Sequence, residues 1–438
     1  MSAMALDTVV AALAPYRARS ERLAGRADEP RWLQEQREAA MTRAERRGFP
    51  DGHDEEWRST PVTAIARATF DEGGAGAPAE LAALRLGSEA AAELVFVNGR
   101  FAPELSSPGA AGLGVTTLRD ALRRRPESLE PHLGRLAPAD SVFADFNTAL
   151  AEDGAVILLP ARALIERPIH LLHIATGAAL AAGRTLIVAG RGSQATVVQT
   201  WTSAGGASLA TGVTEALLED GAVLDHYRLQ QEGEAAFHVT ALHVRQQRDT
   251  RFSDHALLLG GALARTDAAV TLDGEGAECS LDGLFMAGGR QHLDAHTRIE
   301  HARPHGTSRE LYKGVLDGQA RGVFHGRIVV DPQAQKTSAH QANHNLLLSR
   351  EALVSSTPAL EIHADDVKCK HGSTTGQLDA RSLFYLRSRG LAEDAARALL
   401  VYAFASEVAG RVAVPAVRRR LQEQMARRLP GAPQEDFL

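Results

Sequence analysis

From Gly154 onward, the chain carries a long series of short apolar or alternating segments with no room for a helix of three turns between most neighbours. Examples are GAVILLP (154–160), RTLIVAG (184–190), ATVVQTW (195–201) and GVFHGRIVV (322–330), and Gly, Asp-Gly or Gly-Gly separates many such segments. Segments of this kind are typical of β-strands, whereas a parallel β/α architecture needs crossovers of a dozen or more residues. The pattern therefore predicts an all-β body of many short strands: a sandwich, a propeller or a coiled parallel β-helix.

Among these three, the pattern favours the β-helix. Its strands pair with the preceding coil, so it needs few two-residue hairpin turns, and convincing Asn-Gly or Asp-Gly hairpins are few in this region. The sequence has no repeat of fixed length that would decide the question.

The chain divides into three regions by pattern. Residues 1–150 are mostly helical, with one hairpin expected where Asn98-Gly99 separates two apolar runs. Residues 151–376 form the predicted β-helix core, and residues 377–438 return to helical periodicity.

The C-terminal region has clear helix signals. Asp379 is suited to cap a helix over ARSLFYLRSR, and Pro415 is suited to open the last helix. Between them, the segment 391–411 predicts a longer helix with an apolar stripe. The stripe consists of Leu399, Leu400, Phe404 and Val408. Packing on the chain's own body is the usual role of such a stripe.

Composition narrows the class of protein. The 438 residues carry a net charge of −6 and no basic tract near the start, which argues against nucleic acid as a partner. No stretch reaches the roughly 18 apolar residues of a membrane helix, and the N-terminus lacks a signal-peptide pattern, so we expect a cytoplasmic protein. The only cysteines, Cys279 and Cys369, are expected to be reduced thiols, and they cannot supply four thiolates to a cluster.

Standard catalytic motifs are absent from the sequence. It has no G-x-x-x-x-G-K-[ST] phosphate loop, and hence no ATP site of that type, and no H-E-x-x-H, G-x-S-x-G or C-x-x-C. Binding or scaffolding is therefore favoured over catalysis.

The segment DDVKCKHG (365–372) is the sharpest local candidate for a site. If it is extended, Cys369 and His371 lie on one face and present a thiol and an imidazole to one point. Lys368 and Lys370 would lower the pKa of the thiol between them. Two ligands make half a tetrahedral site, so the rest must come from His363, which has the same strand parity, or from another chain. A buried cysteine beside a hydrogen-bonded histidine would give the same pattern.

A long collinear part of the chain resembles the SufB/SufD family of iron-sulfur cluster assembly proteins. The segment DEEWRSTP (54–61) is similar to the family's N-terminal element. The stronger matches, between about 270 and 410, are LDGEGAECSLDGLF (272–285), DAHTRIEHARPHGTSRELYKGVLDGQARGVFHGRIVV (294–330), AQKTSAHQANHNLLLSREALVSSTPALEIHADDVKCKHGSTTGQLD (334–379) and LFYLRSRG (383–390). Its length and its few cysteines make the chain more similar to SufD than to SufB.

The resemblance implies a right-handed parallel β-helix between helical regions, in a non-catalytic scaffold subunit. It implies a heterodimer with SufB and a complex with the ATPase SufC, which docks on the C-terminal helices and supplies ATP hydrolysis. The partner-binding residues expected there are Leu399, Leu400, Phe404 and Val408. It places Cys369 and His371 at a transient iron-sulfur site shared with SufB. For some members it also implies a reduced flavin in the assembled complex.

Two alternatives stay open at this point. A SufB-like member could act as a homodimer. Parallel β-helices also serve as polysaccharide lyases and hydrolases, where Asp365 and Asp366 would be candidate carboxylates, although they are also suited to a solvated turn.

Overall fold

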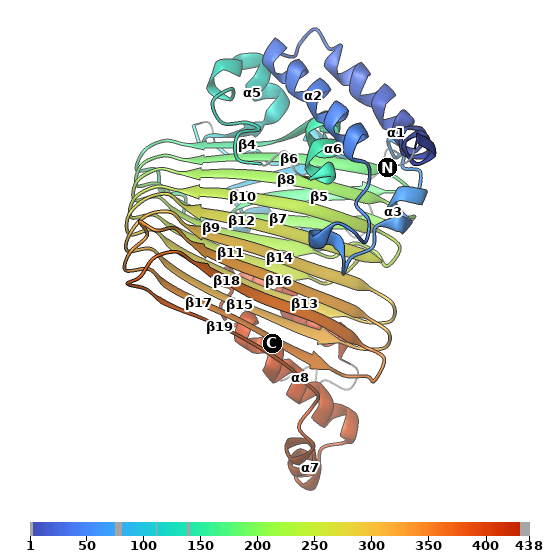
Figure 1. Ribbon diagram of the computed structural model, residues 1–438, viewed down its shortest axis with the longest axis vertical. Coiled ribbons are helices and arrows are strands. Elements are labelled where there is room, and N and C mark those ends of the chain that lie inside the picture. The colour runs from blue at the N-terminus through green and yellow to red at the C-terminus, as the bar shows by residue number, and fades with distance from the viewer. Residues whose placement is uncertain (1–2, 75–80, 111, 138–140, 430–438) are drawn as a thin grey trace.

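A computed structural model describes residues 3–74, 81–110, 112–137 and 141–429, and its centre is a parallel β-solenoid of about eight turns (Figure 1). The prediction of a mainly β protein with a β-helix core and helices at both ends is confirmed. One sheet has ten strands: β1 (Ala92–Val97), β2 (Arg100–Phe101), β5 (Ile169–Thr176), β7 (Gln194–Ala204), β9 (Val223–Gln230), β11 (Arg251–Leu258), β13 (Glu278–Ala287), β15 (Thr307–Leu316), β17 (Ser338–Leu347) and β19 (Lys368–Gly376).

The other sheet has nine strands, and each full coil contributes one strand to each sheet. Its members are β3 (Val115–Thr117), β4 (Asp153–Leu159), β6 (Leu180–Ala189), β8 (Leu209–Leu218), β10 (Phe237–Gln246), β12 (Leu263–Leu272), β14 (His292–His301), β16 (Arg321–Val330) and β18 (Leu353–Ile362). From β4 on, each strand pairs in parallel with the strand two places later in the chain.

The register of these pairs explains why the sequence shows no fixed repeat. Leu180 pairs with Leu209, and Phe237 with Leu263, which are steps of 29 and 26 residues. The step from Arg321 to Leu353 is 32 residues. The turns thus vary in length while the strands stay aligned, so equivalent positions cannot be matched by counting along the sequence.

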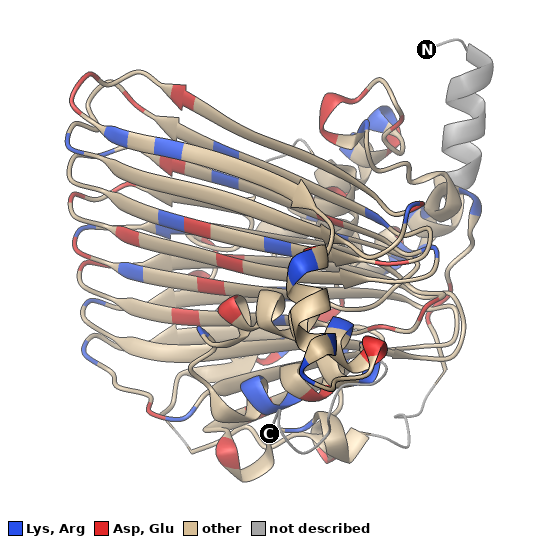
Figure 2. Cartoon of the chain, turned by 90° about the horizontal axis from the view of Figure 1, so that it is seen from below, with Lys and Arg blue, Asp and Glu red and all other residues tan. Residues whose placement is uncertain are grey.

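Alternate side chains point into the solenoid and form its main core. Leu224, Phe252, Leu281, Phe285 and Phe324 belong to this cluster and are almost fully buried. The alternation follows from the two-residue period of a strand. Side chains on the outward faces are covered by the terminal helices or face solvent, and acidic and basic positions are interspersed over the strands (Figure 2).

The N-terminal helices cover the outward face of the nine-stranded sheet at its first coils (Figure 1). They are α1 (Ala3–Ala24), α2 (Arg31–Arg47), α3 (Thr63–Arg67), α5 (Leu118–Arg124) and α6 (Val142–Leu150), with a short 3₁₀ turn, η1, over Glu55–Trp57. The short helix α4 (Leu81–Leu84) packs instead on β1 and β5 of the ten-stranded sheet. The expected hairpin turn at Asn98-Gly99 joins β1 to β2, and both residues have positive φ.

The C-terminal helices pack on the other sheet. They are α7 (Ala380–Ser388), α8 (Glu393–Ala409) and α9 (Pro415–Arg428). The expected cap is present, because the Asp379 side chain accepts hydrogen bonds from the backbone N–H groups of Arg381 and Ser382. Residues of α8 and α9 share an apolar cluster with outward-facing residues of the ten-stranded sheet, whereas α7 extends away from the body (Figure 1).

The solenoid ends in two strands that no other described segment pairs with along their outer edge. β18 and β19 each have a neighbour on one side only, β16 and β17 respectively. Most of their residues are exposed or half-buried, unlike those of the preceding coils. An uncovered pair of strands is a ready template for pairing with another chain.

None of the helices within the described ranges is both long enough and apolar enough to span a lipid bilayer.

Candidate functional site

Cys369 and His371 lie on β19, at the open end of the solenoid. β19 is extended as expected, with Cys369 opposite Ala339 and His371 opposite Gln341 of β17. Cys369 is half-buried and packs against the interior cluster, while His371 is exposed at the rim. The strand period therefore brings both side chains to the inward-facing side of the last coil.

The expectation that the neighbouring lysines lower the pKa of Cys369 is wrong. Burial raises the pKa of this thiol, and Lys368 and Lys370 are exposed. The physical reason is the strand period: residues at i±1 point to the opposite face, away from the thiol. In the chain alone, Cys369 is therefore protonated at neutral pH, and a metal or an added positive charge is needed to produce the thiolate.

His363 is not on the same strand as this pair. It follows the end of β18 and is separated from β19 by the turn at residues 364–367, so the parity argument for it does not apply. Asp365 and Asp366 form that turn, and Asp366 pairs with Lys336. The part of the chain that the structure describes does not bring His363, Cys369 and His371 together as a three-ligand group.

A buried carboxyl group lies two strands behind His371. Glu310 of β15 is opposite Gln341 of β17, which in turn is opposite His371. Gln341 Nε2 donates a hydrogen bond to Glu310 Oε2 at 2.7 Å. Burial raises the pKa of Glu310 to about 7, although Thr297 and Gln341 act in the opposite direction. The inward-facing side chains in register with His371 thus include a carboxyl group that titrates near neutrality.

This titration predicts a pH dependence of stability. A carboxyl whose pKa is raised on folding stabilises the protein at low pH, and the contribution is lost as pH rises from the unfolded value toward about 7. A shift from about 4.5 to about 7 corresponds to roughly 3 kcal/mol. We expect E310Q to remove this dependence, because Gln stays neutral and can still accept from Gln341. Denaturant unfolding of both proteins at pH 5 and pH 8 measures it, and equal pH dependence in both would contradict it.

The apolar stripe of α8 is largely used within the chain. Val408 is fully buried against the solenoid, and Leu399, Leu400 and Phe404 are half-buried. Lys313 of β15 fastens the helix, because its ammonium donates to the Phe404 carbonyl at 2.9 Å and pairs with Glu407 at 2.5 Å. The exposed apolar residues of this region lie elsewhere, on α7.

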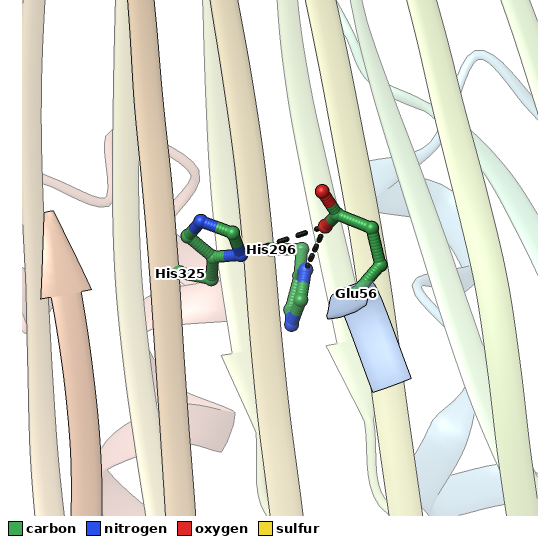
Figure 3. Close-up of side chains that lie close together, drawn as sticks. All are labelled: Glu56, His296 and His325. Atoms are coloured by element: carbon green, nitrogen blue, oxygen red, sulfur yellow. Dashed lines mark ion pairs between the residues drawn. The ribbon is translucent and has the colours of Figure 1, made fainter. Parts of the chain in front are cut away.

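A second cluster, which the sequence analysis missed, lies where the N-terminal segment crosses the nine-stranded sheet (Figure 3). His296 of β14 and His325 of β16 are direct neighbours in register, and Glu56 of η1 lies over both. Glu56 Oε2 is 3.4 Å from His296 Nδ1 and 3.5 Å from His325 Nδ1. Within the described ranges, these three form the one group of three potential metal ligands whose atoms lie within 4.8 Å of one another.

Several contacts hold this cluster in place. Arg265 of β12 lies 3.8 Å from the centre of the Trp57 ring and donates to the Glu56 carbonyl at 2.5 Å. Thr60 Oγ1 donates to Asp294 Oδ2 at 2.6 Å. Residues 56–60, part of the DEEWRSTP segment, are thereby fixed across three coils.

The charges of the cluster act on one another. Burial lowers the pKa of His296, but Asp294 and Glu56 outweigh this effect and raise it to about 9. The contacts with His296 and His325 hold the pKa of Glu56 well below its usual range. Without a bound ligand, the protonated His296 is therefore held between the carboxylates of Glu56 and Asp294.

Only part of this cluster left a signal in the sequence. His296 and His325 are two of the thirteen histidines between His226 and His371, and they are 29 residues apart, which is the step between their two coils. Glu56 is more than two hundred residues away, and nothing in its local pattern pairs it with these strands.

Comparisons with known proteins agree with this architecture. Residues 172–404 match the family described as SUF system FeS cluster assembly, SufBD core domain, and residues 15–171 match the SufBD protein N-terminal region. An iron-sulfur cluster assembly SufBD family protein of Synechocystis sp. is 32% identical over 396 residues, covering 86% of each chain. The iron-sulfur cluster assembly protein SufD of Escherichia coli is 30% identical over 393 residues, covering 88% of this chain and 90% of SufD.

The fold and the site together define a β-solenoid protein with an open C-terminal edge and a Cys-His pair on its last strand. The chain belongs to the SufBD family of the SUF iron-sulfur cluster assembly system.

Proposed function

We propose that this protein is a non-catalytic scaffold subunit that pairs with SufB and docks the ATPase SufC. In this proposal, Cys369 and His371 contribute ligands to a nascent iron-sulfur cluster at the interface with SufB. The cluster is cargo that leaves the assembly. A reduced flavin in the assembly stays a prediction.

The observation that carries the proposal is the distribution of exposed apolar side chains. Five large hydrophobic residues of the described chain are exposed, and four of them lie at the C-terminal end. Leu353 and Ile362 mark the two ends of β18, with 55% and 41% of their surface exposed, and Phe384 and Tyr385 of α7 are 74% and 56% exposed. Apolar side chains gathered beside an open sheet edge indicate a surface that a protein partner covers.

The chemistry of the Cys-His pair supports the same conclusion. A thiol and an imidazole supply two of the four ligands that a tetrahedral iron or zinc centre takes. A partner strand paired along β19 would place its own side chains next to Cys369 and His371. The second half of the coordination sphere would thus arrive with the partner.

The proposed docking of SufC also becomes more specific. Because α8 is packed on the solenoid and tied to Lys313, Val408 is covered unless the helix moves. The exposed pair Phe384 and Tyr385 is accessible without any rearrangement. We therefore place the first contact of the ATPase on α7, with the half-buried Leu399, Leu400 and Phe404 as further contacts.

The pairing surface is tested by substitution at the sheet edge. We expect the double variant L353D/I362D to lose co-purification with SufB, because two carboxylates would be buried without partners in the interface. L164D is a matched control, since Leu164 is 63% exposed in the segment between β4 and β5, far along the chain from this edge. Retained pairing in L353D/I362D, with the unfolding midpoint unchanged, would contradict the proposed edge.

The docking surface is tested in the same way. F384D/Y385D is expected to release SufC while the pairing with SufB persists, because α7 contributes no strand to the edge. The measurement is the co-purification of untagged SufB and SufC with a tagged copy of this chain. Loss of SufB together with SufC would contradict the proposal that α7 is a docking surface for SufC alone.

A further inference from the structure

We propose that Glu56, His296 and His325 bind one divalent transition-metal ion through Glu56 Oε2, His296 Nδ1 and His325 Nδ1. The proposal does not depend on the role of this chain in cluster assembly. It concerns the outward face of the nine-stranded sheet, a different surface from the open edge that carries Cys369 and His371.

The spacing of the donor atoms is the first argument. The two distances from Glu56 Oε2, 3.4 and 3.5 Å, exceed the roughly 2.7–3.2 Å of a normal N–H···O hydrogen bond. Metal bonds of about 2.0–2.1 Å at tetrahedral angles place two ligand atoms about 3.3–3.4 Å apart. The separations are thus long for direct hydrogen bonds and suited to an ion between the atoms.

The ring orientation of His296 is the second argument. Its Nε2 lies 3.1 Å from Asp294 Oδ1, an ion-pair contact that lacks the alignment of a hydrogen bond, and its Nδ1 faces Glu56. A histidine that binds a metal through one nitrogen usually donates its other ring N–H to a carboxylate, which fixes the tautomer and raises the basicity of the ligand. Asp294 is itself held by Thr60 and by Arg265, whose guanidinium is 3.5 Å away.

The charge of the surroundings is the third argument. Glu56, Asp267 and Asp294 are opposed by the guanidinium groups of Arg265 and Arg327, and Arg327 also pairs with Glu361 at 3.4 Å. With neutral imidazoles these four carboxylates and two guanidinium groups carry a net charge of about −2, which a divalent cation compensates. Arg265 also lies 3.2 Å from His296 Nδ1, so this contact must give way on binding, while Arg265 keeps its contacts with Asp267 and Trp57.

The site opens into a cavity of about 490 Å³ that the three ligands help to line. Three protein ligands and access to solvent leave a coordination position for water or an exchangeable group, as in catalytic rather than closed structural zinc sites. Two histidines and a carboxylate suit zinc and ferrous iron, whereas calcium and magnesium prefer sites made of oxygen ligands alone. A bound ion would also cross-link the N-terminal segment to two coils of the solenoid.

The experiment titrates the untagged full-length protein, stripped with chelator, with Zn²⁺ and with Co²⁺ as a spectroscopic probe. We expect the wild type to bind one more equivalent of metal ion than H325A. We also expect Zn²⁺ to raise the unfolding midpoint of the wild type. E56Q and H325A should weaken binding by more than the roughly 10–100-fold that loss of an outer-shell partner causes. Glu56 is exposed, so E56Q tests the site even if a histidine variant folds poorly.

Two controls separate this site from other metal-binding groups. H340A removes an exposed histidine of β17, and C369S/H371A removes the pair at the open edge. Both variants should still bind one metal ion tightly. The bound Co²⁺ should show the visible bands of nitrogen and oxygen ligation without a thiolate charge-transfer band. An equivalent that survives in E56Q and H325A, or that is lost in C369S/H371A, would overturn the proposal and leave the cluster as ion pairs only.

Discussion

Replacement of His371 by Ala is expected to abolish cluster accumulation on the co-purified assembly while leaving the assembly intact. His371 is exposed and makes no contribution to the interior cluster, so its loss should change the free energy of unfolding by less than about 0.5 kcal/mol. The imidazole is one of the two ligands that we propose for this chain at the open edge. Its removal leaves a single thiol whose pKa burial raises.

The measurement is the content of iron and acid-labile sulfide in the anaerobically purified assembly, together with its visible absorption. H340A is the matched control, because His340 is an exposed histidine on the adjacent strand, β17, that points to the outward face. Wild-type sulfide content in the H371A assembly would refute the site assignment.

The largest expected effect on stability comes from Asp254, inside the solenoid. Its carboxylate accepts from His226 Nδ1 at 2.7 Å and from the Arg228 guanidinium at 2.6 Å, and it is fully buried. Burial raises the pKa of Asp254, but Arg228 and His226 outweigh it and hold the pKa well below its usual range. Replacement by Ala would leave Arg228 buried without its counter-charge.

Breaking a buried ion pair in this way costs about 3–5 kcal/mol, so D254A should unfold at a markedly lower denaturant concentration than the wild type. D220A is the control, since Asp220 pairs with the exposed Arg191 in a surface turn and should cost at most about 1 kcal/mol. Equal midpoints for D254A and D220A would show that the interior charges are not stabilised as described.

Local patterns predicted much of this structure. The period of two in DDVKCKHG placed Cys369 and His371 on one side of a strand, and the structure agrees. Asp379 and Pro415 marked helix starts, because caps and first-turn prolines act within a few residues. The alternating segments gave the class of fold, since burial on one face of a strand is a local property.

Features that depend on contacts between distant residues were not predicted. The effect of Lys368 and Lys370 on Cys369 was misjudged because proximity along a strand was taken for proximity in space. The covering of α8 depends on Lys313, which lies on a strand some ninety residues earlier. The group of Glu56, His296 and His325 requires the coil register, and the variable turn lengths conceal that register in the sequence.

The central claim is that this chain supplies an incomplete ligand set and acts only within an assembly. Anaerobic purification of the chain alone, and of the chain co-expressed with SufB and SufC, followed by determination of acid-labile sulfide, tests it most directly. Sulfide distinguishes a cluster from metal bound at Glu56, His296 and His325. We predict sulfide in the assembly and none in the isolated chain; stoichiometric sulfide in the isolated chain would contradict the claim.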